Sequence, residues 1–199
     1  RVRAELRALL IRYGMTEIES RRLLDAWIIE GDFLLIDLPH TFTHAVGNPP
    51  YVRQESISDI LIAEYRARYS TIYDRADLYV PFIERCLSNL VKGGALCFIC
   101  SDRWTKNKYG GPLREMVAHG FHLAAYVDMV DTAAFLSDVI AYPAITLIRR
   151  EKPGPTRISH RPAIEGDALS RLSEAMRADT VPVGSGVVEV QGTVKGREP

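Results

Sequence analysis

Apolar runs typical of buried strands alternate with amphipathic helical patterns along the first three quarters of this chain. The pattern predicts helices over residues 2–12, 16–28, 57–68, 76–91 and 111–120, and strands over 33–36, 43–48, 95–101, 122–129 and 144–150. Strands that alternate with helices favour a layered sheet whose faces are covered by the helices. The expected fold class is therefore α/β.

The pattern fades after Arg150, where the proline-rich stretch EKPGPTRISHRP follows. We predict a linker there, one short helix near residues 167–177 and a tail rich in Gly and Val. The domain organisation that we expect is one domain over residues 1–150 and a linker over 151–199. Because the chain begins with Arg1 and ends in a loop, we also expect it to be a piece of a longer protein.

Charge and cysteine usage exclude some classes of function. Lys and Arg together number 25, as do Asp and Glu, so no overall basic field indicates nucleic acid, and any DNA affinity must be local or supplied elsewhere. Cys97 and Cys100 form a C-x-x-C inside an apolar strand, where residues three apart point to opposite faces. We interpret them as buried thiols and expect no metal. We find neither a membrane-length apolar run nor a signal peptide, which favours the cytoplasm.

The most informative local motif is Asn48-Pro49-Pro50-Tyr51, which follows the predicted strand 43–48. Ligands of open α/β sheets bind outside the carboxyl ends of the strands, and two prolines make the loop there rigid. The side-chain oxygen of Asn48 and the carbonyl of Pro49 would together accept both hydrogens of an NH₂ group, and Tyr51 would offer a face to a flat ring. A plain Asn-Pro turn without function is the alternative.

Further motifs stand in order around this loop. They are GDFLL at 31–35, the segment from Asp77 to Trp104, and AAFLSDVIAYPAITLIRR at 133–150. Together with GNPPY they resemble the amino-methyltransferases that use S-adenosylmethionine, in particular the DNA adenine methyltransferases of bacterial restriction-modification systems. The resemblance implies a partial Rossmann-like methyltransferase sheet with flanking helices, in which residues 1–150 follow the glycine loop that binds the cofactor.

The resemblance also implies roles for single residues. Asp32 and Phe33 match the pair that holds the adenine of S-adenosylmethionine, and Phe82 matches a ring that borders this cofactor. Tyr51 and Phe135 would clamp the target base. The three proposed cofactor contacts have plainer alternatives. Asp32 could occupy a turn, and Phe33 and Phe82 could be core residues.

The implied reaction needs an adenine flipped out of double-stranded DNA, and methyl transfer to its amino group. Arg53 is a candidate for a DNA phosphate contact, as are Lys106 and Lys108, although a solvated loop would also explain the two lysines. The implied setting is a restriction-modification or phage-defence system, with a restriction or specificity subunit or domain as a further partner. The specificity domain would follow the linker.

Two other functions stay open at this point. A protein-glutamine methyltransferase would use the same tetrapeptide on a similar NH₂ group. A degenerate copy kept as a scaffold or DNA-recognition subunit would need no catalytic loop, so the intact motif argues against it. Because the glycine loop is not found in these 199 residues, we expect that they bind the cofactor weakly and are inactive alone.

Overall fold

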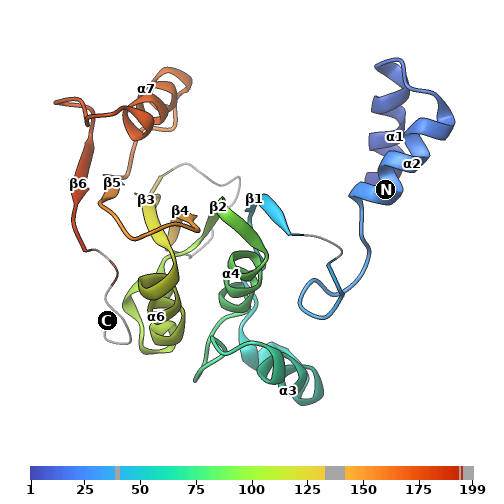
Figure 1. Cartoon of the computed structure of the whole chain (residues 1–199), viewed down its shortest axis with the longest axis horizontal. Coiled ribbons are helices and arrows are strands. Elements are labelled where there is room, and N and C mark those ends of the chain that lie inside the picture. Colours follow the sequence, from blue (N-terminus) through green and yellow to red (C-terminus); the bar gives the residue numbers. More distant parts are fainter. Residues whose placement is uncertain (39–40, 133–141, 193, 195–199) are drawn as a thin grey trace. The chain divides into compact units, whose positions relative to one another are not determined.

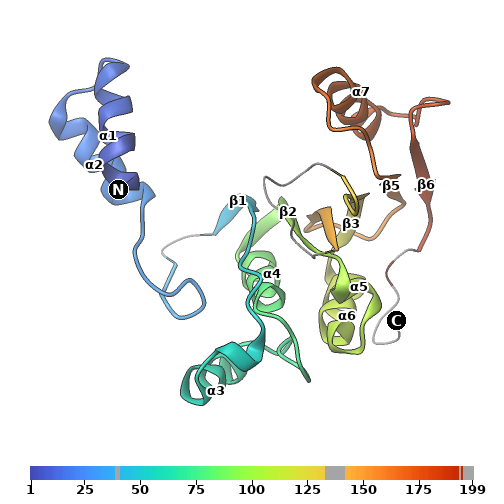
Figure 2. The ribbon, with the colours of Figure 1, turned by 180° about the vertical axis from the view of Figure 1, so that it is seen from behind.

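A computed structural model describes residues 1–38, 41–132, 142–192 and 194. The chain divides into two compact units, Arg1–Asp37 and Leu38–Pro199. Figures 1 and 2 show the elements of these units from opposite sides.

The smaller unit contains the two helices predicted at the start of the chain. They are α1 (Val2–Arg12) and α2 (Glu17–Trp27). Thr16 begins the second helix with a capping box, in which its side chain accepts from the backbone of Glu19 while the Glu19 carboxylate accepts from the backbone of Thr16. Both predicted helices are confirmed within one residue, and the capping box explains where α2 begins.

The strand predicted over residues 33–36 is wrong, because this stretch forms a turn. The carboxylate of Asp32 accepts a hydrogen bond from the backbone N–H of Leu34 at 2.8 Å, and its carbonyl accepts from Leu35 and Ile36, each at 2.9 Å. An Asp that bonds the backbone two residues ahead favours a turn over an extended strand.

The larger unit is built on a six-stranded mixed sheet in the order β1-β2-β4-β3-β5-β6. Its strands are β1 (Phe42–Gly47), β2 (Leu90–Ser101), β3 (His122–Asp128), β4 (Pro143–Arg149), β5 (Thr156–His160) and β6 (Val187–Val190). Its helices are α3 (Asp59–Arg68), α4 (Tyr79–Ser88), the short α5 (Arg103–Lys106), α6 (Gly111–Gly120) and α7 (Gly166–Arg177), with single 3₁₀ turns at Gln54–Ser56 and Lys108–Gly110. The α/β fold class is confirmed.

Strand directions decide which loops meet. β1 and β2 are parallel, with Gly47 opposite Phe98, whereas β4 is antiparallel to β2, with Pro143 opposite Ser101. The carboxyl ends of β1 and β2 and the amino end of β4 therefore lie at one edge of the sheet. The segments that follow β1 and β2 and precede β4 are brought together there.

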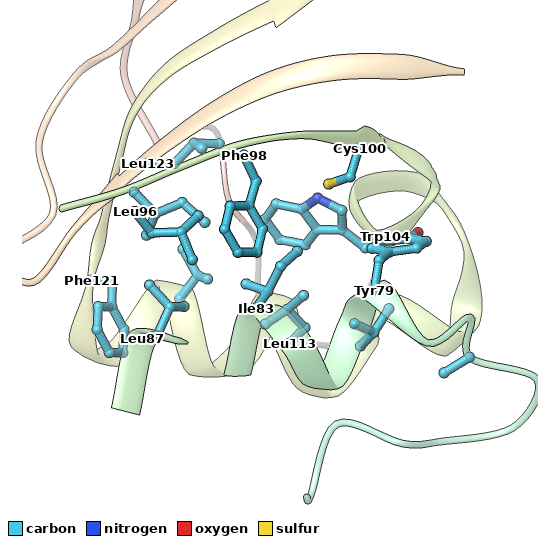
Figure 3. Packing of buried hydrophobic residues seen from close by; sticks show 14 of the residues in the cluster. Tyr79, Ile83, Leu87, Leu96, Phe98, Cys100, Trp104, Leu113, Phe121 and Leu123 are labelled. Carbon is cyan, nitrogen blue, oxygen red and sulfur yellow. The ribbon is translucent and has the colours of Figure 1, made fainter. Parts of the chain in front are cut away.

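The core lies between one face of the sheet and helices α4 and α6. Figure 3 shows Leu96 and Phe98 of β2 pointing toward Ile83 of α4 and Leu113 of α6, with the indole of Trp104 beside Phe98 and Cys100. Ile83, Leu96, Trp104 and Leu113 are fully buried. Burial of such side chains contributes about 1.5 to 3 kcal/mol each, so this layer fixes the strand ends that carry the loops.

The turn from α4 into β2 differs from the prediction. We expected a helix to residue 91, stopped by Lys92-Gly93-Gly94, but α4 ends at Ser88 and the glycines lie inside β2. Gly93 has φ +77°, and its N–H donates to the carbonyl of Arg150 at 2.9 Å. A left-handed glycine within a strand produces a bulge rather than an end.

The predicted linker contains part of the sheet. β5 lies within it and pairs in parallel with β3, and β6 pairs antiparallel with β5, while the helix expected near 167–177 is confirmed as α7. Whether residues 151–199 lead toward a recognition domain stays a prediction.

The cysteines take the positions expected of a strand. Cys100 is buried beside Trp104, whereas Cys97, on the opposite face of β2, is half-buried. In the portion of the chain that the structure describes, no helix is long and apolar enough to span a bilayer.

Candidate active site

The Asn48-Pro49-Pro50-Tyr51 loop leaves the carboxyl end of β1 with its first and last residues exposed and its prolines turned inward. Asn48 is exposed, Pro49 is buried, Pro50 is half-buried and Tyr51 is 37% exposed. Buried prolines with fixed φ hold the loop in one conformation. The Asn48 amide and the Tyr51 ring are thus presented to solvent from a rigid backbone.

Two hydrogen bonds tie the loop to its neighbours. The Tyr51 hydroxyl donates to the carbonyl oxygen of Ile99 in β2 at 3.4 Å, and the N–H of Leu78 donates to the carbonyl of Val52 at 2.9 Å. Partial burial, with a smaller contribution from Cys100, raises the pKa of Tyr51 to about 12. The phenol therefore stays neutral at physiological pH and can act as a stacking face without carrying charge.

A buried carboxylate secures the segment between α3 and α4. Glu84 of α4 accepts four hydrogen bonds, from the backbone N–H and the hydroxyl of Ser70 and from the same two groups of Thr71, at 2.6–3.1 Å. Glu84 and Thr71 are buried. This network fixes the chain that leads into α4, the helix whose start is bonded to the loop.

Opposite charges gather behind the loop. Partial burial raises the pKa of Asp77, while the positive charges of Arg103 and Arg53 oppose the rise and Glu55 reinforces it. Arg53 follows the loop and Arg103 follows β2, so both cations come from the same edge of the sheet. Both arginines therefore interact electrostatically with the same carboxylate.

A second carboxylate, Asp102, lies directly after β2 and is 1% exposed. It accepts hydrogen bonds from the Tyr126 hydroxyl at 2.7 Å and from the ammonium of Lys106. Burial, and then the hydrogen bond to Asp102, raise the pKa of Tyr126. The charge of Lys106 is consequently shared with a buried partner.

The other residues singled out from the sequence lie in different surroundings. Asp32 and Phe33 are half-buried in the smaller unit, where Asp32 forms the turn described above, and Phe82 is half-buried against the core cluster. Lys108 lines a groove of about 640 Å³ whose described lining holds no residue of the tetrapeptide. Phe135 lies outside the described residues.

Some residues were not singled out from the sequence, namely Asp102 and Arg103, which follow β2, Tyr142, which precedes β4, and Asp77, which interacts electrostatically with Arg103. A signal existed for Asp102 and Arg103, because they follow a strand at the edge where ligands bind. Within the ranges that the structure describes, no group of three or more His, Cys, Asp or Glu residues could hold a metal ion.

Comparison with known proteins shows the family to which the chain belongs. The family model described as Eco57I restriction-modification methylase matches residues 15–135, which include the tetrapeptide, α4 and β2. The chain belongs to the Eco57I restriction-modification methylase family. The match also covers the turn at Asp32 and the segment that contains Phe135.

Two curated relatives show how much of a family member the chain represents. It is 55% identical over 194 residues to the type II methyltransferase M.XhoI of Xanthomonas vasicola, and 56% identical over 193 residues to M.PaeR7I of Pseudomonas aeruginosa. Each match covers 96% of this chain but only 36% and 34% of the relatives. The chain thus spans about a third of their length.

A solved structure supports the fold. The methyltransferase subunit of a type I restriction-modification system from Streptococcus thermophilus superimposes with a TM-score of 0.61 at 11% identity, covering 86% of this chain and 41% of that subunit. The partial methyltransferase-like sheet expected from the sequence is therefore confirmed.

Proposed function

We propose that the full-length gene product is an S-adenosylmethionine-dependent DNA methyltransferase that methylates the exocyclic amino group of adenine in a restriction-modification system. The observation that carries the proposal is the rigid Asn48-Pro49-Pro50-Tyr51 loop at the carboxyl end of β1, with Asn48 exposed and Pro49 buried. The names of the family and of the type II relatives support DNA over protein glutamine as the substrate.

In this proposal the loop activates the adenine nitrogen by hydrogen bonding. The side-chain oxygen of Asn48 and the carbonyl of Pro49 accept the two N–H bonds of the amino group, which turns the nitrogen lone pair out of conjugation with the ring. The base must first leave the duplex, at a cost of a few kcal/mol, and stack on Tyr51, with Phe135 as the second ring. After transfer, the nitrogen has gained the methyl group and loses one proton to water.

The cofactor would supply the methyl group from its sulfonium sulfur. Asp32, Phe33 and Phe82 are each half-buried, so each keeps surface that a ligand can reach. A carboxylate can accept a hydrogen bond from the amino group of a purine, and an aromatic ring can pack against a purine face. We therefore keep these residues as the proposed adenosine contacts, with Asp32 as acceptor.

DNA would approach the same edge of the sheet. Arg53 is exposed next to the loop and is proposed as a phosphate contact, with Lys106 and Lys108 as further candidates. Residues 151–199 are proposed to lead toward a recognition domain or a specificity subunit, which would select the methylated sequence.

The test is transfer of labelled methyl from S-adenosylmethionine to unmethylated DNA by the full-length protein. We expect label in adenine, and its loss in Asn48→Ala, because the amino group loses an acceptor. The exposed Arg171 of α7 offers a matched control, since Arg171→Ala should keep wild-type activity. Label in a protein co-substrate instead of DNA would indicate a protein-glutamine methyltransferase. Absence of label from both would exclude the proposed reaction.

A further inference from the structure

Arg103 and Tyr142 form a stacked pair at the edge of the sheet where the loop ends. Arg103 is the first residue of α5, two residues after the last residue of β2, and Tyr142 immediately precedes β4. The Arg103 guanidinium carbon lies 4.8 Å from the centre of the Tyr142 ring. A guanidinium at this distance over an aromatic face is attracted by the ring.

A backbone hydrogen bond places the segments of Arg103 and Tyr142 side by side. The N–H of Asp102 donates to the carbonyl of Tyr142 at 2.9 Å, and the N–H of Arg103 faces the hydroxyl of Ser101 at 3.4 Å. Because the Asp102–Tyr142 bond continues the β2–β4 pairing past Ser101 and Pro143, the sheet brings Arg103 and Tyr142 together.

The guanidinium is available for a further partner. Among the described residues it makes the ring contact and electrostatic interactions with Asp77 and Tyr109, but no side-chain hydrogen bond or ion pair. An arginine that packs on a ring can still use the N–H groups at the edge of its guanidinium, and that edge is the part that binds a phosphate bidentately. Lys106, by contrast, already bonds the buried Asp102.

The pair is also accessible and lies at the same edge of the sheet as the loop. Tyr142 is 45% exposed and Arg103 is half-buried. Tyr51 bonds Ile99 of β2, four residues before Arg103, and Asp77 interacts with both Arg53 and Arg103. A nucleotide stacked on Tyr51 would thus bring its own backbone toward this edge.

We propose that Arg103, oriented by the ring of Tyr142, binds a phosphate of the DNA strand that carries the target nucleotide. This assignment rests on the proposed function, because it presumes DNA at the Tyr51 edge. Arg103 is then a substrate-binding residue, and Tyr142 is a positioning residue that acts through it.

The experiment measures binding of the full-length protein to duplex DNA at several salt concentrations, together with KM and kcat for methyl transfer. One lost phosphate contact lowers the slope of log affinity against log salt by about 0.9. We expect this decrease in Arg103→Ala, with affinity about tenfold weaker or more, as befits the loss of charge-assisted hydrogen bonds. KM for DNA should rise while kcat at saturating DNA stays near the wild-type value.

Companion variants separate charge from structure. Tyr142→Phe keeps the ring and should keep the wild-type slope, whereas Tyr142→Ala should weaken affinity by loosening the arginine. If Arg103→Ala lowers the unfolding temperature, Arg103→Gln replaces it, and its salt slope tests whether Arg103 binds a phosphate. Arg171→Ala on α7 is the control for removing a positive charge elsewhere.

The outcomes distinguish this inference from the proposed function. Wild-type methyl transfer to DNA together with an unchanged salt slope in both Arg103 variants would overturn the inference and leave the function standing. If the wild-type protein neither binds nor methylates DNA, the proposed function fails first and this assignment fails with it.

Discussion

The backbone of Gly110 packs directly against the carbonyl group of Trp104. A Cβ at position 110 would lie 1.8 Å from that carbonyl oxygen and 2.5 Å from its carbon. The same carbonyl accepts a hydrogen bond from the buried Arg114 at 2.8 Å, so it has little room to move. This contact closes the tight path from α5 into α6 at the edge where the site lies.

Gly110→Ala should therefore destabilise the protein by about 3 kcal/mol, because the added methyl must displace backbone rather than a flexible side chain. Gly120→Ala is the matched control, since a Cβ there meets nothing within 4 Å, and its effect should stay within about 1 kcal/mol. Urea unfolding of both variants measures the difference. Equal stabilities would show that the α5–α6 path is looser than described.

Glu84→Gln should weaken the segment that leads into α4. The amide keeps the size of the carboxylate but replaces one acceptor oxygen by a donor that faces two donors, so we expect a loss of about 2 to 4 kcal/mol in the free energy of unfolding. Glu64, exposed on α3, gives the control Glu64→Gln, which should be near neutral. A neutral Glu84→Gln would mean that the four hydrogen bonds contribute nothing net.

The three cysteines should differ in reactivity. Burial raises the pKa of Cys86 and Cys100 to about 12, whereas Cys97 is less buried and its pKa is raised less strongly. Since the thiolate is the nucleophile, iodoacetamide at pH 8 should label Cys97 first in the native protein, and all three at similar rates in urea. Peptide mass spectrometry follows each site, and native Cys100 reacting as fast as Cys97 would contradict the burial.

The raised pKa values of these thiols also predict that the protein loses stability at alkaline pH. Burial raises the pKa of the Cys100 thiol from its usual value of 9.0 to about 12. Between these values the folded state binds more protons than the unfolded state, so the free energy of unfolding falls as pH rises above about 9. Urea titrations at increasing pH should show this fall, and Cys100→Ala should make it shallower.

Tyr51 should act through its ring rather than its hydroxyl. The bond to Ile99 is long at 3.4 Å, so Tyr51→Phe should retain most methyl transfer by the full-length protein. Tyr51→Ala removes the stacking face and should lower kcat/KM by about 10- to 100-fold. Because the pKa of Tyr51 is raised to about 12, its hydroxyl should contribute no pH dependence between pH 7 and 10. A large loss in Tyr51→Phe would assign the role to the hydroxyl instead.

Local patterns predicted the parts of the fold that local chemistry determines. The capping signal at Thr16 and the apolar face of α4 specify helices by themselves, and the run from Ala95 to Ser101 specifies a buried strand. The run 33–36 has similar composition but follows Asp32. The Asp32 side chain accepts a hydrogen bond from the backbone N–H of Leu34, which favours a turn. β5 was missed for the opposite reason, since a short, partly polar stretch between prolines becomes a strand only through pairing with β3.

The residues of the site also differ in whether local sequence could predict them. Asn48 and the prolines could be found because a strand end and a rigid loop are adjacent in sequence. Tyr142 could not, because its approach to Arg103 requires β4 to run antiparallel to β2, a pairing that no local pattern contains. The roles of the tetrapeptide residues and of Asp32, Phe33 and Phe82 remain predictions that the proposed assays test.

The full burial of Trp104 has an optical consequence. The chain has two tryptophans, and the other, Trp27, is 59% exposed in the smaller compact unit. The shielded indole should emit at shorter wavelength and escape quenching by iodide, while Trp27 should emit further to the red and be quenched. Each compact unit therefore carries its own intrinsic fluorophore, and the melting of one can be followed separately from the other without any label.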